Sequence, residues 1–229
     1  MLFRSEAQHP RRADVRLRAL HEIDLQFIAL QPHFLHAPRI VAPMPLHVHV
    51  ARRIGAANTP RFEDGAWHAH NTDGEGLLAA LVPHIDVAGR QVAVLGAGGA
   101  ARAAAVSLRD AGGVITLYAR DAAKATKVAA DIDCIGGLLA DYESGVAEVV
   151  INATPVGMTE TDETPIPTAG LRGEELVLDM IYRPTVTRLL LAARERGCTT
   201  VPGLEMFLEQ AAAQHVWWFE EAPVAGVMR

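Results

Sequence analysis

The sequence predicts an α/β protein built on a Rossmann-like, doubly wound parallel sheet, with a second, reduced α/β lobe beside it. Two observations predict this class. Short apolar segments alternate with helical patterns along most of the chain, and one such segment runs through a cluster of glycines into an alanine-rich helix. Alternation of this kind favours parallel strands joined by helices.

The glycine cluster lies in residues 91–102, whose sequence is QVAVLGAGGAAR. Residues 92–95 form a short apolar strand, and the glycines after it allow a tight turn that brings the backbone close to a diphosphate. The helix that follows directs its free N–H groups and positive dipole end at that anion. The candidate phosphate-binding residues are Gly96, Ala97, Gly98, Gly99 and Ala100. The spacing is a variant of the usual fingerprint, so a glycine turn before a core helix is the alternative.

A helix over residues 101–111 and a strand over 114–118 complete a βαβ unit. Where this second strand ends, an NAD site usually has an acid for the ribose 2′-hydroxyl. This chain has Arg120 there and Lys124 one helical turn later. Two cations suit a 2′-phosphate, so NADP is favoured over NAD. Asp121 is interpreted as the N-cap of a helix over residues 122–131, although it could instead repel the phosphate.

The alternation continues to the end of the chain. The expected strands are 146–152, 176–179 and 199–201, with a helix over 185–196 and a final helix over 203–219. Ligands of such sheets bind outside the carboxyl ends of the strands, so residues 152–158 and 179–182 are the places to look for chemistry. Trp217, Trp218 and Phe219 in the final helix are interpreted as core residues.

Composition narrows the class of partner. The chain has 229 residues and a net charge of -6, so no basic surface predicts binding to nucleic acid or an anionic membrane. No apolar run reaches the roughly 18–20 residues of a membrane span, and no apolar leader is evident. The two cysteines, Cys134 and Cys198, lack metal spacing and suit a reducing compartment, so we expect a cytoplasmic protein. Oligomeric state is left open.

Seven segments, in order, resemble one family. They are IGAANT (54–59), NTDG (71–74), GAGGAARA (96–103), ARDAAK (119–124), NATPVGM (152–158), DMIY (179–182) and GLEMFLEQ (203–210). Together they are similar to the motifs of shikimate dehydrogenases. The resemblance implies an NADP-dependent enzyme that interconverts 3-dehydroshikimate and shikimate, its small-molecule substrate. A quinate or quinate/shikimate dehydrogenase is the alternative, as is a nucleotide-binding protein without catalysis.

The resemblance also implies roles for individual residues. Asp73 would be half of a catalytic acid/base pair, and Asn58, Tyr182 and Gln210 would bind substrate together with it. Thr154, Gly203 and Met206 would complete the cofactor site, to which Arg120 and Lys124 also belong. From the residues alone, Asp73 is equally suited to capping the helix over 74–81, Asn58 to a turn, and Gln210 to a solvated helix position.

The expected domain boundaries follow from the same motifs. Residues 1–72 would form an atypical N-terminal substrate lobe and residues 73–202 the NADP-binding Rossmann domain. Residues 203–229 would return to the substrate lobe as a C-terminal helix.

The first 50 residues depart from the family. Its catalytic lysine is absent, because the only lysines are Lys124 and Lys127. His47 is nearest to the missing position, and an imidazole titrates near neutral pH, so His47 is a candidate substitute. The family's N-terminal serine pair is absent too, whereas six histidines and six arginines occur in residues 1–50. No metal site is expected. Either a divergent lobe or a frame change upstream of Ala51 explains this composition.

Overall fold

The computed structural model of the protein describes residues 49–63, 66–159 and 163–222. Their elements are α1 (His49–Ile54), β1 (Thr59–Glu63), β2 (Ala66–His70), α2 (Asp73–Leu81), β3 (Gln91–Leu95), α3 (Gly99–Asp110), β4 (Val114–Ala119), α4 (Ala122–Asp131), β5 (Ile135–Leu138), the 3-10 turn η2 (Leu139–Asp141), β6 (Val149–Asn152), β7 (Leu176–Asp179), α5 (Arg188–Glu195), β8 (Thr199–Pro202) and α6 (Gly203–Phe219). His47 lies outside the described residues. Within those ranges no helix has the length and apolarity to cross a membrane.

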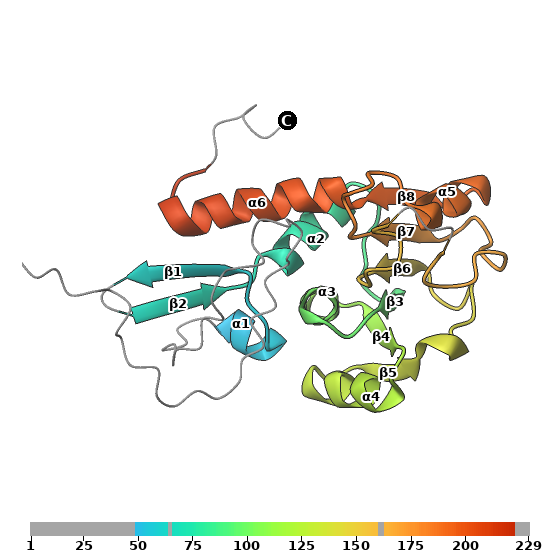
Figure 1. The fold of residues 1–229 in the computed structure, drawn as a ribbon, viewed down its shortest axis with the longest axis horizontal. Helices are drawn as coiled ribbons and strands as arrows, with labels where there is room; N and C mark the ends of the chain where they lie inside the picture. The colour runs from blue at the N-terminus through green and yellow to red at the C-terminus, as the bar shows by residue number, and fades with distance from the viewer. Residues whose placement is uncertain (1–48, 64–65, 160–162, 223–229) are drawn as a thin grey trace, which may run out of the picture.

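Six strands form one parallel sheet in the order β5-β4-β3-β6-β7-β8 (Figure 1). The chain starts in the middle at β3, proceeds outward to β5, and then returns to β6 on the other side of β3. This is the doubly wound order of dinucleotide-binding folds, in which the reversal point between β3 and β6 opens a crevice at the carboxyl ends of the strands. The predicted fold class is therefore confirmed.

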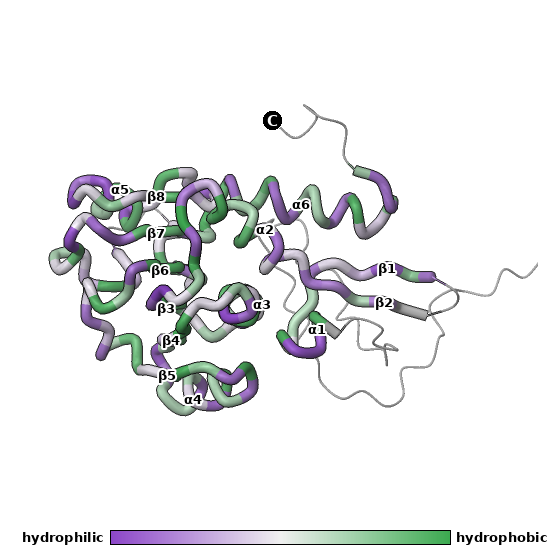
Figure 2. The backbone as a smooth tube through the Cα atoms, turned by 180° about the vertical axis from the view of Figure 1, so that it is seen from behind, coloured by the Kyte–Doolittle hydropathy of each residue, from purple (hydrophilic) through white to green (hydrophobic). Residues whose placement is uncertain are grey.

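Apolar side chains alternate between the two faces of this sheet. Val92 and Val94 pack with α2, α3 and α4 in one core, whereas Ala93 and Leu95 pack with α5 and the segment around Tyr142 in another. Strands buried on both faces read as continuous apolar runs, which is why the sequence revealed them. Figure 2 shows hydrophobic residues along β4 and β6, two inner strands of the sheet.

The second lobe is small in the described part of the chain. β1 and β2 form an antiparallel pair, α1 precedes them, and α6 runs back from the sheet to lie across them (Figure 1). Glycines permit the close packing of α2 that joins the two parts. A Cβ on Gly76 would lie 2.6 Å from the backbone nitrogen of Gln210, and one on Gly74 would overlap Ser107.

Several elements differ from the predictions, among them β6, which starts at Val149 rather than at residue 146. β5 was not predicted, because its sequence, IGGL, has no apolar run; its glycines instead fit under the Tyr118 ring and against the Ala125 carbonyl, where a Cβ would clash. α3 starts at Gly99, within the glycine turn. α5 starts only at Arg188, since Thr187 accepts a hydrogen bond from the Leu190 amide and so caps it.

Candidate active site

Two cavities meet at the carboxyl ends of the strands. The first has a volume of about 610 Å³ and lies between α6, the β7 end and the start of α2. The second, about 620 Å³, surrounds the glycine turn. Their shared wall consists of Ala100, Ala153, Thr154 and Pro155. A ligand that fills the second cavity can therefore present one end to a molecule in the first.

The second cavity contains most of the nucleotide-site residues predicted from the sequence, whereas Gly203 and Met206 line the first cavity. Its lining includes Gly96, Ala97, Gly98, Gly99, Ala100, Arg120, Lys124 and Thr154. Gly96 has φ +120°, and a Cβ there would lie 2.8 Å from the carbonyl oxygen of Ala153, so this position requires glycine. Gly98 precedes the first turn of α3, and the positive dipole end of that helix favours an anion. This backbone fits a dinucleotide diphosphate.

Arg120 and Lys124 are exposed at the rim of the same cavity, after β4. Asp121 also lines it, but its carboxylate accepts a hydrogen bond of 3.1 Å from the Lys124 amide and caps α4. The interpretation of Asp121 as an N-cap is confirmed. This bond holds the Asp121 carboxylate at the start of α4.

Asp73 lies at the floor of the first cavity and is 2% exposed. It is the first residue of α2, and its own amide is held by the Asn71 side chain at 3.0 Å. Its carboxylate makes no capping bond within the described chain, so the capping alternative is wrong. Oδ1 instead accepts a hydrogen bond of 2.7 Å from Nδ2 of Asn58. Burial raises the pKa of Asp73 to about 6, and the bond from Asn58 opposes that rise.

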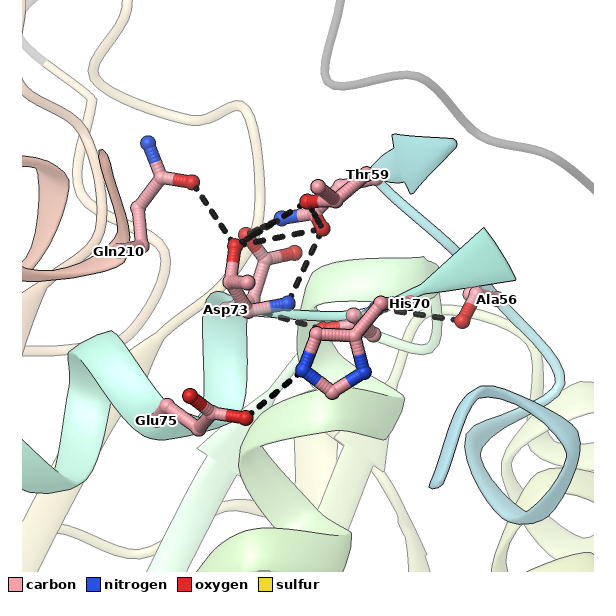
Figure 3. Close-up of polar contacts among 9 residues, drawn as sticks. Ala56, Thr59, His70, Asp73, Glu75 and Gln210 are labelled. Atoms are coloured by element: carbon pink, nitrogen blue, oxygen red, sulfur yellow. Dashed lines mark hydrogen bonds and ion pairs between the residues drawn. The ribbon is translucent and has the colours of Figure 1, made fainter. Parts of the chain in front are cut away.

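Asn58 and Gln210 both form hydrogen bonds with Thr72, the residue before this aspartate. Figure 3 shows the Gln210 side chain directed toward the start of α2, where Asp73 lies. The Asn58 side-chain oxygen accepts a hydrogen bond of 3.0 Å from the Thr72 amide, and the Thr72 hydroxyl donates to Oε1 of Gln210 at 3.3 Å. Gln210 is only 9% exposed. Asn58 is therefore more than a turn residue and Gln210 is not solvated, since both hold the segment that carries Asp73.

The opposite wall is apolar and aromatic. Tyr182 stacks on Phe207 at 4.5 Å between ring centroids, and Gly203 and Met206 lie beside them. Gly203 permits a close approach, because a Cβ there would lie 2.5 Å from the carbonyl oxygens of both Asp179 and Ile181. The first cavity thus combines a carboxyl, three amides and a phenol with a large apolar surface.

The core assignment of the aromatic run at the end of α6 is wrong in part. Trp217 is half-buried and stacks on His70, but Trp218 is 42% exposed at the rim of the first cavity and Phe219 is 61% exposed. Consecutive helix residues point about 100° apart, so one packed face cannot bury all three. Trp218 donates its indole N–H to the Pro60 carbonyl at 3.0 Å, which joins α6 to β1.

A second buried aspartate holds the wall between the cavities. Oδ1 of Asp179 accepts hydrogen bonds from Asn152 Nδ2 at 2.9 Å and the Ile181 amide at 3.1 Å, and Oδ2 accepts from the Thr187 hydroxyl at 2.6 Å. The Asn152 oxygen accepts in turn from the Thr154 hydroxyl at 2.7 Å. Burial raises the pKa of Asp179 to about 6 despite these three bonds.

Sequence reasoning assigned no role to Thr72, Asn152 or Asp179, although all three lie in segments that it singled out. Each is fully buried and polar. The bond from Thr72 to Gln210 joins residues 138 positions apart, so no local spacing reveals it. For Asp179 and Asn152 a signal did exist, since both end buried parallel strands that turn out to be neighbours.

Known proteins resemble this chain over most of its length. A comparison with models of protein families gives no match. A shikimate dehydrogenase (NADP(+)) from Halorubrum lacusprofundi is 42% identical over 195 residues, which cover 80% of this chain and 70% of the relative. The shikimate 5-dehydrogenase of Thermus thermophilus, solved with NADP(H) and shikimate, superimposes with a TM-score of 0.73 at 32% identity. Ligand-free 5-ketofructose reductase of a Gluconobacter species gives 0.71 at 37% identity. Each structural match covers 81% of this chain and 70% of the other.

Proposed function

This chain belongs to the shikimate dehydrogenase family, and we propose that it interconverts 3-dehydroshikimate and shikimate with NADP as cofactor. One observation carries the proposal. A buried carboxyl with a raised pKa, Asp73, lines a cavity that shares a wall with the cavity around the glycine turn. Such a junction lets a nicotinamide and a polyol meet beside a group that transfers protons.

The residues around the second cavity support NADP rather than NAD. The glycine turn and the start of α3 accommodate the diphosphate. Arg120 and Lys124 offer two cations to a 2′-phosphate, and a guanidinium can bind that group through two parallel hydrogen bonds. When bound, NADPH supplies the hydride that reduces the ring carbonyl carbon. Gly203 and Met206 would line the nicotinamide, and Thr154 would lie between cofactor and substrate.

Asp73 performs the proton transfer in this proposal. With a pKa of about 6, its carboxyl exchanges a proton near neutral pH. The protonated form donates to the carbonyl oxygen as that oxygen becomes a hydroxyl, and in the reverse direction the carboxylate accepts the hydroxyl proton. Asn58 fixes the orientation of the Asp73 carboxyl through the 2.7 Å bond. Asn58, Tyr182 and Gln210 hold the ring hydroxyls and the substrate carboxylate.

No lysine of this chain can share that step, because Lys124 and Lys127 both lie on α4, on the nucleotide side. Asp73 therefore acts without the lysine of the family pattern. His47 remains the proposed second acid. Replacing His47 by alanine should slow turnover several-fold at unchanged NADPH affinity, and an unaltered rate removes it from the mechanism.

The decisive experiment is steady-state NADP reduction by the purified protein with shikimate. Quinate, and 5-ketofructose with NADPH in the reductive direction, are the competing substrates; the second is included because of the similarity to 5-ketofructose reductase. A higher kcat/KM for shikimate supports the proposal. NADPH binding, seen by quenching of tryptophan fluorescence, without turnover of any of the three would leave only a nucleotide-binding protein.

The cofactor preference has its own test. Arg120→Ala should weaken NADP binding about 10-fold or more while NAD binding changes little, because a charge-assisted bond contributes about 1.5–3 kcal/mol. Lys127→Ala is the matched control, since it removes the same charge from α4 at a position outside the cavity lining. Equal losses for NADP and NAD contradict a 2′-phosphate site.

We also propose a cytoplasmic location, supported by two free thiols at Cys134 and Cys198 that a reducing compartment would preserve. We further propose that the chain divides into domains after residue 72 and after residue 202. The parallel sheet lies within 91–202, and α2 and α6 pack on each other beside it.

A further inference from the structure

Arg102 of α3 contacts the segment that leads to the substrate-side asparagine. Its Nε donates to the carbonyl of Ile54, the last residue of α1, and its Nη1 pairs with the Asp131 carboxylate of α4 at 3.3 Å. The Arg102 side chain is only 17% exposed. A carbonyl at a helix end has no partner within its own helix, so this guanidinium satisfies it from a different element.

The position of the Arg102 guanidinium also explains why residue 55, in the segment 54–59, is a glycine. Gly55 has φ +71°, which favours glycine, and a Cβ there would lie 2.8 Å from Nη2 of Arg102 and 3.3 Å from its Cζ. Arg102 therefore packs against the bare Cα of Gly55. Three residues later, Asn58 donates to Asp73. The path of the chain from α1 to Asn58 is thus set by a side chain of α3.

The same helix begins at the glycine turn. Gly99 and Ala100 line the nucleotide cavity, and Arg102 follows within the first helical turn, about 4.5 Å along the helix axis from Gly99. Ala101 and Ala103, on either side of Arg102, are fully buried, so the core holds this turn in place. An anion bound at the start of α3 therefore also fixes the base of the Arg102 side chain. The nucleotide side and the substrate side are thereby connected through one residue.

We propose that Arg102 is a positioning residue that couples occupancy of the nucleotide cavity to the placement of Asn58, and through Asn58 to Asp73. The proposal rests on the proposed function for the identity of the two ligands. It assigns a role to the arginine of GAGGAARA, which the cofactor site does not use, since Arg102 is outside the lining of both cavities described here.

A second arginine joins the same two helices and provides a matched control. Arg53 pairs with Asp110 of α3 at 2.8 Å, but both side chains are largely exposed, at 47% and 43%. Exposed pairs of this kind contribute little to stability, and the three atoms nearest to a Cβ on Gly55 all belong to Arg102 rather than to Arg53. Comparing substitutions of the two arginines therefore distinguishes a general loss of α1–α3 attachment from the loss of the specific contact with residues 54 and 55.

The kinetic test compares Arg102→Met, Arg102→Lys and Arg53→Met. Arg102→Met should raise the KM for shikimate about 10-fold or more, as expected for the loss of a charge-assisted hydrogen bond. The Kd for NADPH should stay within about twofold, whereas kcat should fall as well because Asn58 orients Asp73, and Arg102→Lys should restore part of both KM and kcat. Arg53→Met should change none of these by more than about twofold. An unchanged KM in Arg102→Met, or an equal rise in Arg53→Met, overturns the proposal.

A second experiment, which does not depend on catalytic activity, measures backbone hydrogen exchange. In the unaltered protein, NADPH should slow exchange at residues 54–58, which lie outside the lining of the nucleotide cavity. In Arg102→Met this protection should be lost while protection at residues 96–100 is kept. Absence of NADPH-dependent protection at 54–58 in the unaltered protein overturns the coupling, whether or not shikimate is turned over. If Arg102→Met does not fold, Arg102→Lys carries the same comparison, and full protection with wild-type KM in that variant overturns the requirement for the guanidinium.

Discussion

Two aspartates of this protein are equally buried and differ in what surrounds them. Asp73 is 2% exposed and Asp179 is 0% exposed, and burial raises the pKa of each to about 6. Asp179 accepts three hydrogen bonds, which occupy both of its oxygens. Asp73 accepts one, on Oδ1, and its Oδ2 accepts none from the described part of the chain.

This difference separates a reactive group from a structural one. A raised pKa is a common signature of catalytic acids, but structural networks produce the same shift. The informative property is the free acceptor on Asp73 together with its place in the wall of a cavity. Asp179 lies outside the lining of the two cavities described, and its bonds tie β6 and β7 together.

The largest expected effect is on catalysis. Asp73→Asn keeps the shape of the side chain but cannot exchange a proton, so kcat should fall about 10²- to 10⁴-fold, with little change in NADPH affinity. In the unaltered enzyme, shikimate oxidation should decline as the pH falls below about 6, because the base becomes protonated. Stopped assays across pH check both points. A kcat near that of the unaltered enzyme would make Asp73 structural, like Asp179.

The next largest effect is on stability. Asp179→Ala leaves two buried donors, the Ile181 amide and the Thr187 hydroxyl, without an acceptor, whereas Asn152 Nδ2 keeps its bond of 3.2 Å to the Val156 carbonyl. This should lower the free energy of unfolding by about 2–5 kcal/mol. Asp73→Ala is the matched control and should cost about 1 kcal/mol or less, since Asn58 Nδ2 also lies 3.2 Å from the Thr72 hydroxyl. Urea titration of the two variants measures the difference. Similar losses would remove the distinction between the two carboxylates.

The sequence predicted the sheet well because parallel strands buried on both faces appear as uninterrupted apolar runs, as in β3, β6 and β7. It failed at β5, where two glycines fit beneath Tyr118 and against α4. That fit depends on packing against neighbouring elements, which local patterns do not contain.

For the site, motif order located Asp73, Asn58 and Gln210, but not the bonds among them. The Thr72 hydroxyl joins α2 to α6 only after both lobes have packed. The aromatic run in α6 was misread for a related reason: the sequence shows three apolar residues, whereas only the packing of α6 on β1 decides which of them is covered. Long-range geometry is what the sequence lacked in each case.

The third effect is the pH dependence of stability. Both aspartates have folded-state pKa values of about 6, above the unfolded value near 3.8, so the folded protein holds protons that the unfolded chain releases. Their stabilising contribution is complete below the unfolded pKa and is lost as the pH rises through about 6, by roughly 3 kcal/mol for each group. Unfolding measured between pH 4 and 7 should show this decline.

Single substitutions show how much each aspartate contributes to the fall in stability with rising pH. Asp73→Asn and Asp179→Asn should each flatten the profile by about half, since each removes one titrating carboxyl. Asp179→Asn can retain its contacts, because an amide oxygen accepts from Asn152 and Ile181 while its N–H donates to Thr187. A profile that keeps its full slope in either variant would assign the titration to other groups.

The smallest effect concerns an exposed aspartate, which extends the comparison to the surface. Asp121 caps α4, and Asp121→Ala should cost about 1 kcal/mol of stability. Asp121→Ser keeps a capping oxygen without the charge, so it should restore most of that loss. Because Asp121 lines the cofactor cavity with Arg120 and Lys124, removing its charge in either variant should leave NADP affinity unchanged or improve it. Weaker NADP binding in Asp121→Ser than in the unaltered protein would mean that the carboxylate orients the two cations, a role neither buried aspartate has.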